Sequence, residues 1–474
     1  MCAGAAFGGE SGLQTVGESG DRPVGFLLTT HDLGAPEGRN MGAAGYSYEF
    51  VLRAIRPLLE KLGTVVRVPN TARDLAEAVR AFKDRGLVPV HLGFLPYQDF
   101  LFVPGAAHVV MPMWEFPDVP REAWKGNRQY NWPETANRAD LSLVSGPFLE
   151  GALRRAGVTK PLRIVPVPVP DGYFDIPPWD PAETTRLECP AYVFGPCEEA
   201  VAQSGKPGSA TGLWEGARWT ASTAMAWTLG RRRYDHLARA VKRWMRKRVL
   251  PYPLANGLTL SGVVYTSVLN PNDRRKNWQG LIRAFLTALG DQPDATLVLK
   301  LATDDMGCVR HVIHTYQAMG PHRCAVVFIC DYLGEETMLR LCRATTFYAH
   351  ATRAEGSCLP LMNHMAAGRP AISPVHSAIA DYFGEKLGFV VESVQEAAGW
   401  PHESRFRART TWARIDIDSL ARAFADSHAM ARHRPEDHAG LAGRGREAIR
   451  AWAGRQAVMA RLTEALGELG LSRR

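Results

Sequence analysis

Short apolar runs alternate with longer amphipathic stretches in two parts of the chain, on either side of an irregular segment between residues 177 and 260. The predicted strands are 24–30, 87–91, 107–112, 261–269, 295–301 and 325–330, and the predicted helices are 46–62, 72–85, 278–289, 308–319 and 335–342. Strands that alternate with helices indicate parallel sheets. We therefore predict an α/β protein with two successive βα halves.

Composition narrows the class of protein. The chain has 474 residues, of which 46% are hydrophobic, so it can form two or three domains of ordinary size. It contains no apolar run long enough to cross a membrane, and residues 1–22 lack the basic flank of a secretory signal. We expect a mobile tail there. The eight cysteines show no metal-ligand spacing, which favours reduced thiols in a cytoplasmic protein without structural zinc.

Positive charge is concentrated in residues 231–248, which contain nine Lys or Arg and a single Asp. The net charge of this segment, +8, equals that of the whole chain. On a helix, the apolar side chains share one face, namely Tyr234, Leu237, Val241, Trp244 and Met245. This basic amphipathic helix would pack on its own protein, or dock on an anionic membrane surface. Nucleic-acid binding is not expected, because the segment lacks an interleaved aromatic platform and a known reading motif.

The stretch 346–373 is the most informative in the chain. It predicts a strand, a charged turn at Glu355 and Gly356, a helix, and a second strand. Pro360 fits the first turn of that helix, where its missing amide costs nothing. The backbone amides of Gly356, Ser357, Cys358 and Leu359 would then stand at a helix N-terminus, a position that favours anions and especially phosphates.

This stretch resembles the signature of glycosyltransferase family 4, a group of retaining enzymes with the GT-B fold. The matching residues are Glu355, Gly356, Leu359, Pro360, Met365, Ala366, Gly368, Arg369 and Pro370. Asn363 stands where the family has a second glutamate. The resemblance implies that Glu355 contacts the transferred sugar and that Asn363 faces the ribose of a nucleotide-sugar donor. An amide loses the charge-assisted strength of a carboxylate in that role.

The resemblance also implies two facing Rossmann-like domains with a basic helical insert between them. It is closer over residues 262–388 than over 24–173. The expected division is a tail at 1–22, an acceptor-side domain at 23–175, a linker and insert at 176–260, a donor-side domain at 261–430, and C-terminal helices at 431–474 that pack back on the first domain.

A basic cluster follows the strand 261–269 and comprises Arg274, Arg275 and Lys276. Lys276 occupies the family's phosphate-binding lysine position, whereas the arginine position falls at Asn270 or Pro271. The resemblance places the donor's diphosphate between Lys276, with Arg275 or Arg274 assisting, and the helix that begins after Glu355. The nucleobase would lie near Asp331 and Tyr332.

The acceptor side is expected at the end of the strand 107–112, where Trp114 and Glu115 follow. Ligands of open α/β sheets bind at that edge. Alternatively, Trp114 packs against the loop that leads to Trp132, and Glu115 is solvated. Gly42 and Gly45 would let a ligand approach the backbone closely, or would belong to a flexible surface loop.

The leading hypothesis is a cytoplasmic, metal-independent, retaining glycosyltransferase without a cofactor. It would move a sugar from a nucleotide sugar to a saccharide or lipid-linked acceptor, in bacterial surface polysaccharide or glycolipid synthesis. The alternatives are a glycosyltransferase-like scaffold that has lost turnover, a nucleic-acid-binding protein, and a GT-B epimerase or phosphorylase. Asp416 and Asp418 could suggest a metal-binding Asp-x-Asp, but they precede an amphipathic segment, so we predict a helix N-cap.

Overall fold

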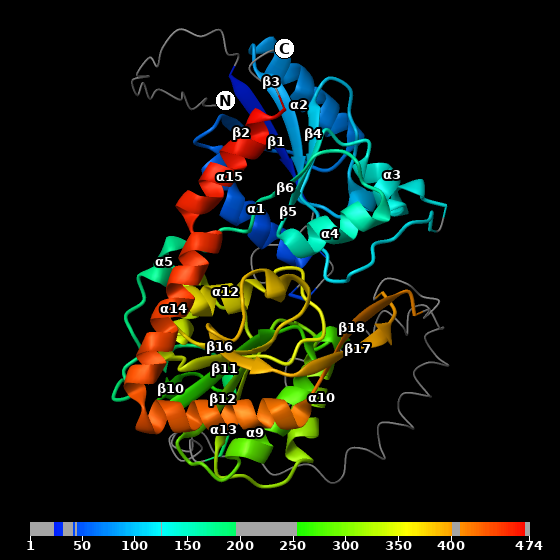
Figure 1. Cartoon of the computed structure of the whole chain (residues 1–474). Coiled ribbons are helices and arrows are strands. Elements are labelled where there is room, and N and C mark those ends of the chain that lie inside the picture. Colours follow the sequence, from blue (N-terminus) through cyan, green and yellow to red (C-terminus); the bar gives the residue numbers. More distant parts are fainter. Residues whose placement is uncertain are drawn as a thin grey trace, which may run out of the picture.

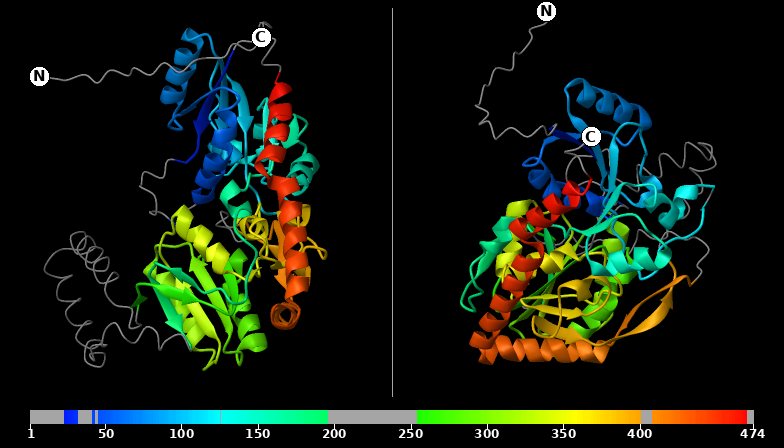
Figure 2. Two further views of the ribbon diagram at one scale, coloured as in Figure 1. Left: turned by 90° about the vertical axis from the view of Figure 1, so that its left-hand side faces the viewer. Right: turned by 45° about the horizontal axis from the view of Figure 1, so that its top comes forward.

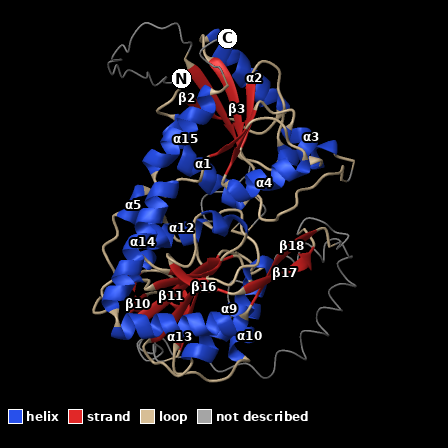
Figure 3. Cartoon of the chain, viewed as in Figure 1, coloured by secondary structure: helices blue, strands red, loops and turns tan. Residues whose placement is uncertain are grey.

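The computed structural model describes residues 23–31, 41–42, 45–124, 126–195, 254–400 and 408–469. The predicted tail, residues 1–22, and the predicted basic helix, residues 231–248, lie outside the described residues. The remaining chain forms two α/β domains, one above the other in Figure 1. Each is built around its own sheet, as the two red layers of Figure 3 show. The predicted α/β class is confirmed.

The first domain contains a six-stranded parallel sheet in the order β2-β1-β3-β4-β5-β6. Its strands are β1 (Val24–Thr29), β2 (Thr64–Arg67), β3 (Val88–Gly93), β4 (Ala107–Val110), β5 (Leu141–Val144) and β6 (Leu162–Ile164). Its helices are α1 (Tyr46–Leu59), α2 (Ala72–Asp84), α3 (Trp132–Ala136) and α4 (Pro147–Ala156), with short 3-10 turns η1 (Tyr97–Asp99) and η2 (Arg128–Tyr130). Central strands are buried on both faces, as expected of a parallel sheet covered by helices.

The second domain contains an eight-stranded sheet in the order β16-β15-β14-β11-β12-β13-β8-β9. Its parallel strands are β11 (Val263–Leu269), β12 (Ala295–Leu301), β13 (Ala325–Ile329), β14 (Phe347–Ala349), β15 (Ala371–Pro374) and β16 (Gly388–Val391). Its helices and 3-10 turns are η3 (Arg274–Lys276), α9 (Trp278–Leu289), α10 (Met306–Gln317), α11 (Glu335–Ala344), α12 (Leu359–Ala366) and η4 (Ser377–Asp381). The repeated strand and helix units predicted from the hydrophobic pattern account for this parallel core except for β16, which was not predicted.

Antiparallel strands flank this core and were not predicted from the sequence. β8 (Ala191–Phe194) and β9 (Leu254–Ala255) extend the edge of the sheet beyond β13, and β7 (Thr185–Leu187) pairs with β10 (Leu258–Leu260). A hairpin of β17 (Ser393–Ala398) and β18 (Thr410–Ile415) projects from the domain on the side away from the C-terminal helices (Figure 1).

Three C-terminal helices join the domains, namely α13 (Ile417–His433), α14 (Pro435–Ala453) and α15 (Arg455–Gly467). The Asp416 carboxylate accepts a hydrogen bond of 2.7 Å from the Ser419 amide, which confirms the predicted N-cap. In Figures 1 and 2, α14 and α15 run along one side of the molecule, from the second domain to the first. Val458, Leu462 and Leu466 of α15 are buried in the core of the first sheet.

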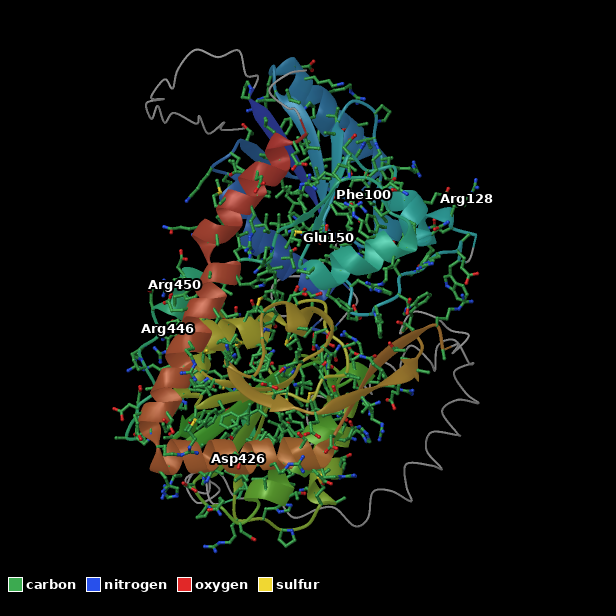
Figure 4. The ribbon with its side chains drawn as sticks, in the orientation of Figure 1. Phe100, Arg128, Glu150, Asp426, Arg446 and Arg450 are labelled. Carbon is green, nitrogen blue, oxygen red and sulfur yellow. The ribbon has the colours of Figure 1, made fainter. Side chains whose placement is uncertain are left out.

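Helix α14 is attached to the chain that crosses between the domains, which includes α5 (Asp171–Phe174). The Arg446 guanidinium donates to the carbonyl oxygen of Ile176 at 2.7 Å, and the Arg450 guanidinium lies 4.7 Å from the centre of the Phe174 ring. Both arginines project from α14 in Figure 4. Among the described residues, no helix is long and apolar enough to cross a membrane.

We predict that Leu462→Ala lowers the free energy of unfolding by about 2–5 kcal/mol, because it removes a fully buried side chain between α15 and the first sheet. Urea denaturation followed by circular dichroism measures the change. The matched control is the exposed neighbour Thr463→Ala, for which we expect a change within about 0.5 kcal/mol. Equal effects of the two substitutions would show that α15 is not docked.

Candidate functional site

Charged side chains from both domains meet where the loops after β4, β11 and β14 face one another. Glu115 comes from the first domain, and Arg275, Lys276 and Glu355 come from the second. Carboxyl ends of parallel strands are where open α/β sheets bind ligands. The structure thus brings four of the residues predicted from the sequence into one cluster.

Lys276 and Glu355 form a close ion pair, with the Lys276 ammonium donating to a Glu355 carboxylate oxygen at 2.5 Å. Although burial alone would raise the pKa of Glu355, Lys276 and Arg275 lower it to about 2. The backbone also fixes the carboxylate, because the Glu355 amide donates to the Ser377 hydroxyl at 2.9 Å. Glu355 therefore stays charged, and Lys276 is held beside it.

Arg275 links the two domains. Its guanidinium lies 3.2 Å from a Glu115 carboxylate oxygen and 2.6 Å from an Asp273 oxygen, and it donates to the Ala354 carbonyl at 2.7 Å. Burial opposes the charge, but Glu115 and Asp273 raise the pKa of Arg275. Burial also raises the pKa of Glu115, although Arg275 offsets part of that effect. The cluster holds two cations and three carboxylates, so its own acids already compensate its bases.

The turn that leads into α12 has an unusual backbone conformation. Cys358, at the N-cap position, has φ 54° and ψ 60°, a left-handed conformation that non-glycine residues seldom adopt. The Tyr382 hydroxyl holds this turn by donating to the Ser357 carbonyl at 2.8 Å. Leu359 begins the helix proper. Phosphate binding by this turn, which the resemblance implies, stays a prediction.

The first domain packs directly on the same turn. The Ser145 hydroxyl donates to the Gly356 carbonyl at 3.0 Å, and a Cβ added to Gly356 would lie 3.2 Å from the Trp114 carbonyl oxygen. Across the same interface, the Asp381 carboxylate accepts from the Phe148 amide at the start of α4, at 3.1 Å. Ser145 and Asp381 were not predicted, because a single polar residue gives no sequence signal of the distant backbone group that it contacts.

Four of the predicted donor-side residues lie outside the cluster. Asn363 hydrogen-bonds the hydroxyl of Tyr173 in α5. Arg274 is exposed, as is Asp331 beyond the end of β13. Tyr332 is half-buried, and its amide donates to the Asp331 carboxylate at 2.8 Å.

On the predicted acceptor side, the Trp114 ring is buried, with its centre 4.7 Å from that of Trp132. The packing alternative therefore describes Trp114, whereas Glu115 is ion-paired rather than solvated. Gly42 has φ 82°, and its carbonyl accepts from the Asn270 amide at 3.0 Å, so this loop reaches the second domain. Gly45, with φ 88°, is the N-cap of α1.

His350, Glu355 and Cys358 place a nitrogen, an oxygen and a sulfur within 4.8 Å of one another. Zn²⁺ accepts all three donor types. Burial lowers the pKa of His350 to about 3, so its ring stays neutral, which is the form that binds a metal ion. In this arrangement, however, the Glu355 charge is compensated by Lys276, whose ammonium would repel a cation.

Little space is left between the domains beside the turn into α12. The cavity beside Ser145, Ser357 and Tyr382 has a volume of about 10 Å³, which is room for roughly one water molecule. Pockets for drug-sized ligands occupy about 300–1,000 Å³. A ligand of that size would enter this part of the cleft only after the domains have moved apart.

No protein-family model matches the chain, and no curated protein matches its sequence. Solved structures do match. The HepE protein of Anabaena, in complex with UDP and glucose, is 12% identical and aligns over 94% of this chain and 100% of its own, with a TM-score of 0.53. Sucrose-phosphate synthase from Thermosynechococcus elongatus is 15% identical and aligns over 95% and 99%, with a TM-score of 0.54. The chain has the GT-B fold. A glycosyltransferase from Rickettsia africae is 8% identical and aligns over 94% of this chain and 98% of its own, with a TM-score of 0.54.

We predict that Gly356→Ala destabilises the protein by about 1–3 kcal/mol, because the added methyl group overpacks the contact with the Trp114 backbone. Thermal unfolding measures the loss. The matched control is Gly443→Ala inside α14, where an added Cβ meets nothing within 4 Å and the unfolding temperature should not fall. Equal unfolding temperatures for both variants would mean that the two domains do not press together at Gly356.

Proposed function

We propose that this protein transfers a sugar from a nucleotide-sugar donor to an acceptor. The observation that carries the proposal is the pairing of Lys276 with Glu355, beside the turn into α12, at the cleft of a GT-B fold. The likeness to a structure that holds UDP and glucose supports it. A nucleotide sugar presents both a diphosphate, which needs cations, and hydroxyl groups, which need acceptors, and this pair supplies one of each.

The chemical roles follow from the charges. Negative charge builds on the departing diphosphate as the glycosidic bond breaks, and preorganised cations and amide dipoles stabilise it. Lys276 would turn from Glu355 to that diphosphate, with Arg275 and the turn from Gly356 to Leu359 assisting. Glu355 would then accept hydrogen bonds from hydroxyls of the donor sugar. After the swap, the diphosphate would balance the Lys276 charge, and the donor hydroxyls would satisfy the hydrogen-bond acceptors of Glu355.

The finer steps come from the resemblance to family 4. The anomeric configuration would be retained, with the departing phosphate taking the proton of the acceptor hydroxyl on the same face of the sugar. No metal or cofactor would be needed. The acceptor would be a saccharide or a lipid-linked saccharide of bacterial surface polysaccharide or glycolipid synthesis. The enzyme would work in the cytoplasm, and residues 231–248 would hold it to an anionic membrane surface.

A second candidate function is a glycosyltransferase-like scaffold that binds a nucleotide sugar without turnover. Two observations favour it. Asn363, at the position of the family's ribose-binding glutamate, is bonded to Tyr173, and Asn270, near the position of the missing arginine, is bonded to Gly42. In this structure, both side chains therefore form these hydrogen bonds within the protein. Selective nucleotide-sugar binding without transfer or hydrolysis would favour the scaffold.

We predict that Lys276→Gln lowers sugar transfer or donor hydrolysis by about 100- to 1,000-fold, because one preorganised cation is lost from the leaving group. Glutamine keeps a donor for Glu355, so the buried carboxylate is not stranded. The measurement is release of the nucleoside diphosphate from a panel of nucleotide sugars, with thermal shift to show donor binding.

The control for this experiment is Arg283→Met, which removes an exposed cation on α9 and should leave turnover unchanged. Near-normal turnover of Lys276→Gln would remove Lys276 from the mechanism. No donor binding by the wild-type protein, with any nucleotide sugar of the panel, would contradict both candidate functions.

A further inference from the structure

A lysine that the sequence analysis did not single out is buried beside the candidate site. Lys300 lies near the end of β12 and is 6% exposed. Its ammonium donates to the sulfur of Met41 at 3.8 Å, and among the described residues it forms no ion pair with a carboxylate. Burying an ammonium without a strong acceptor is costly, and a thioether is a weak one. Burial accordingly lowers the pKa of Lys300 to about 8.

Lys300 lies on the face of the sheet that carries α12. Leu299 and Leu301 pack into the core on the opposite face, so alternation turns Lys300 the other way. Val268 of β11, in register with Lys300, packs against the apolar cluster that contains Leu361 of α12. The Lys300 ammonium therefore lies on the same side of the sheet as the turn where the diphosphate is expected.

The place of β12 in the sheet suggests which part of the ligand Lys300 would meet. Sheet order is β14-β11-β12-β13, and neighbouring strands lie about 4.8 Å apart. Lys276 and Glu355 follow β11 and β14, whereas Lys300 is one strand further on, in register with Ile329 of β13. With the diphosphate at Lys276, a nucleoside that extends toward β13 would pass Lys300.

Local charge favours a neutral acceptor over a second phosphate. Asp331, two residues beyond Ile329, is close enough to stabilise the Lys300 charge electrostatically. The same carboxylate would repel a phosphate, but it would not repel a carbonyl oxygen. The Met41 sulfur, from the first domain, accepts this hydrogen bond in the structure, and separation of the domains would withdraw it.

We propose that Lys300 recognises the nucleobase of the donor, by donating a hydrogen bond from its ammonium to a carbonyl oxygen of the base. This inference rests on the proposed binding of a nucleotide sugar. A lysine ammonium donates and never accepts, so it matches the carbonyl oxygen that uracil or guanine presents, whereas adenine carries an amino group, itself a donor, where guanine carries that oxygen. Lys300 is then a specificity-determining residue of the second domain.

The test compares the binding of UDP, GDP, ADP and pyrophosphate by calorimetry, for the wild type and Lys300→Met. Loss of a hydrogen bond from a charged donor should weaken UDP or GDP binding about 10- to 100-fold. ADP and pyrophosphate binding should be unchanged. The matched control is Lys386→Met, an exposed lysine in the same domain, which should bind as the wild type does.

A second readout is the pH dependence of binding. The wild type should lose affinity for UDP or GDP as the pH rises above about 8 and Lys300 loses its proton, whereas Lys300→Met should not. The other titratable groups that face Lys300, among the described residues, are Cys330 and Asp331. Burial raises the pKa of Cys330 to about 12, so its thiol stays neutral over this range.

Each outcome decides the matter. Unchanged UDP and GDP binding by Lys300→Met overturns the inference, and equal losses for pyrophosphate overturn it by assigning Lys300 to the phosphates. If the wild type binds none of the nucleoside diphosphates, the proposed function fails and the inference with it. Lys300→Gln, which keeps a neutral donor, should recover part of the lost affinity and serves if the methionine variant does not fold.

Discussion

The structure depends on one electrostatic constraint, the compensation of buried charge between the two domains. Arg275 is held by carboxylates from both sides of the cleft, Glu115 and Asp273, and the neighbouring Lys276 is held by Glu355. Removing one partner of a buried pair strands the other charge at a cost of about 3–5 kcal/mol. The closed arrangement is therefore stable only while each charge keeps its partner or receives a substitute.

The diphosphate of the proposed donor would be such a substitute. It carries the negative charge that Arg275 and Lys276 require, so its binding would release Glu115 and Glu355 for other partners. Glu115 would be the easier of the two to release, because burial raises its pKa, whereas the cations lower that of Glu355. Binding of an anionic ligand and opening of the cleft would thus be coupled through the same side chains, a form of linkage that needs no separate regulatory site.

Much of this fold was accessible from the sequence, because hydrophobic periodicity reports the burial of each strand and helix. The parallel core of both sheets and the N-cap at Asp416 follow from such local patterns. The antiparallel strands β8 and β9 did not follow, because an edge strand of two to four residues leaves too short a pattern. The pairing of Glu115 with Arg275 joins residues 160 positions apart, and only the packing of the domains reveals it. Lys300 was not singled out because it falls inside the predicted strand 295–301, where the sequence pattern does not distinguish a buried lysine from an exposed one.

The chain passes between the domains twice, and the two passages lie side by side. The Val169 amide, in the first, donates to the carbonyl of Ala453, next to the break between α14 and α15 at Gly454. If the domains moved apart, two adjacent passages would act as a hinge along one edge of the molecule. Rotation about that hinge would move the near edge little and the far edge most, where Arg409 beside β18 contacts Glu122 of the first domain. The cleft would therefore open by rotation about the edge formed by α14 and α15, and the domains would separate first at the hairpin of β17 and β18.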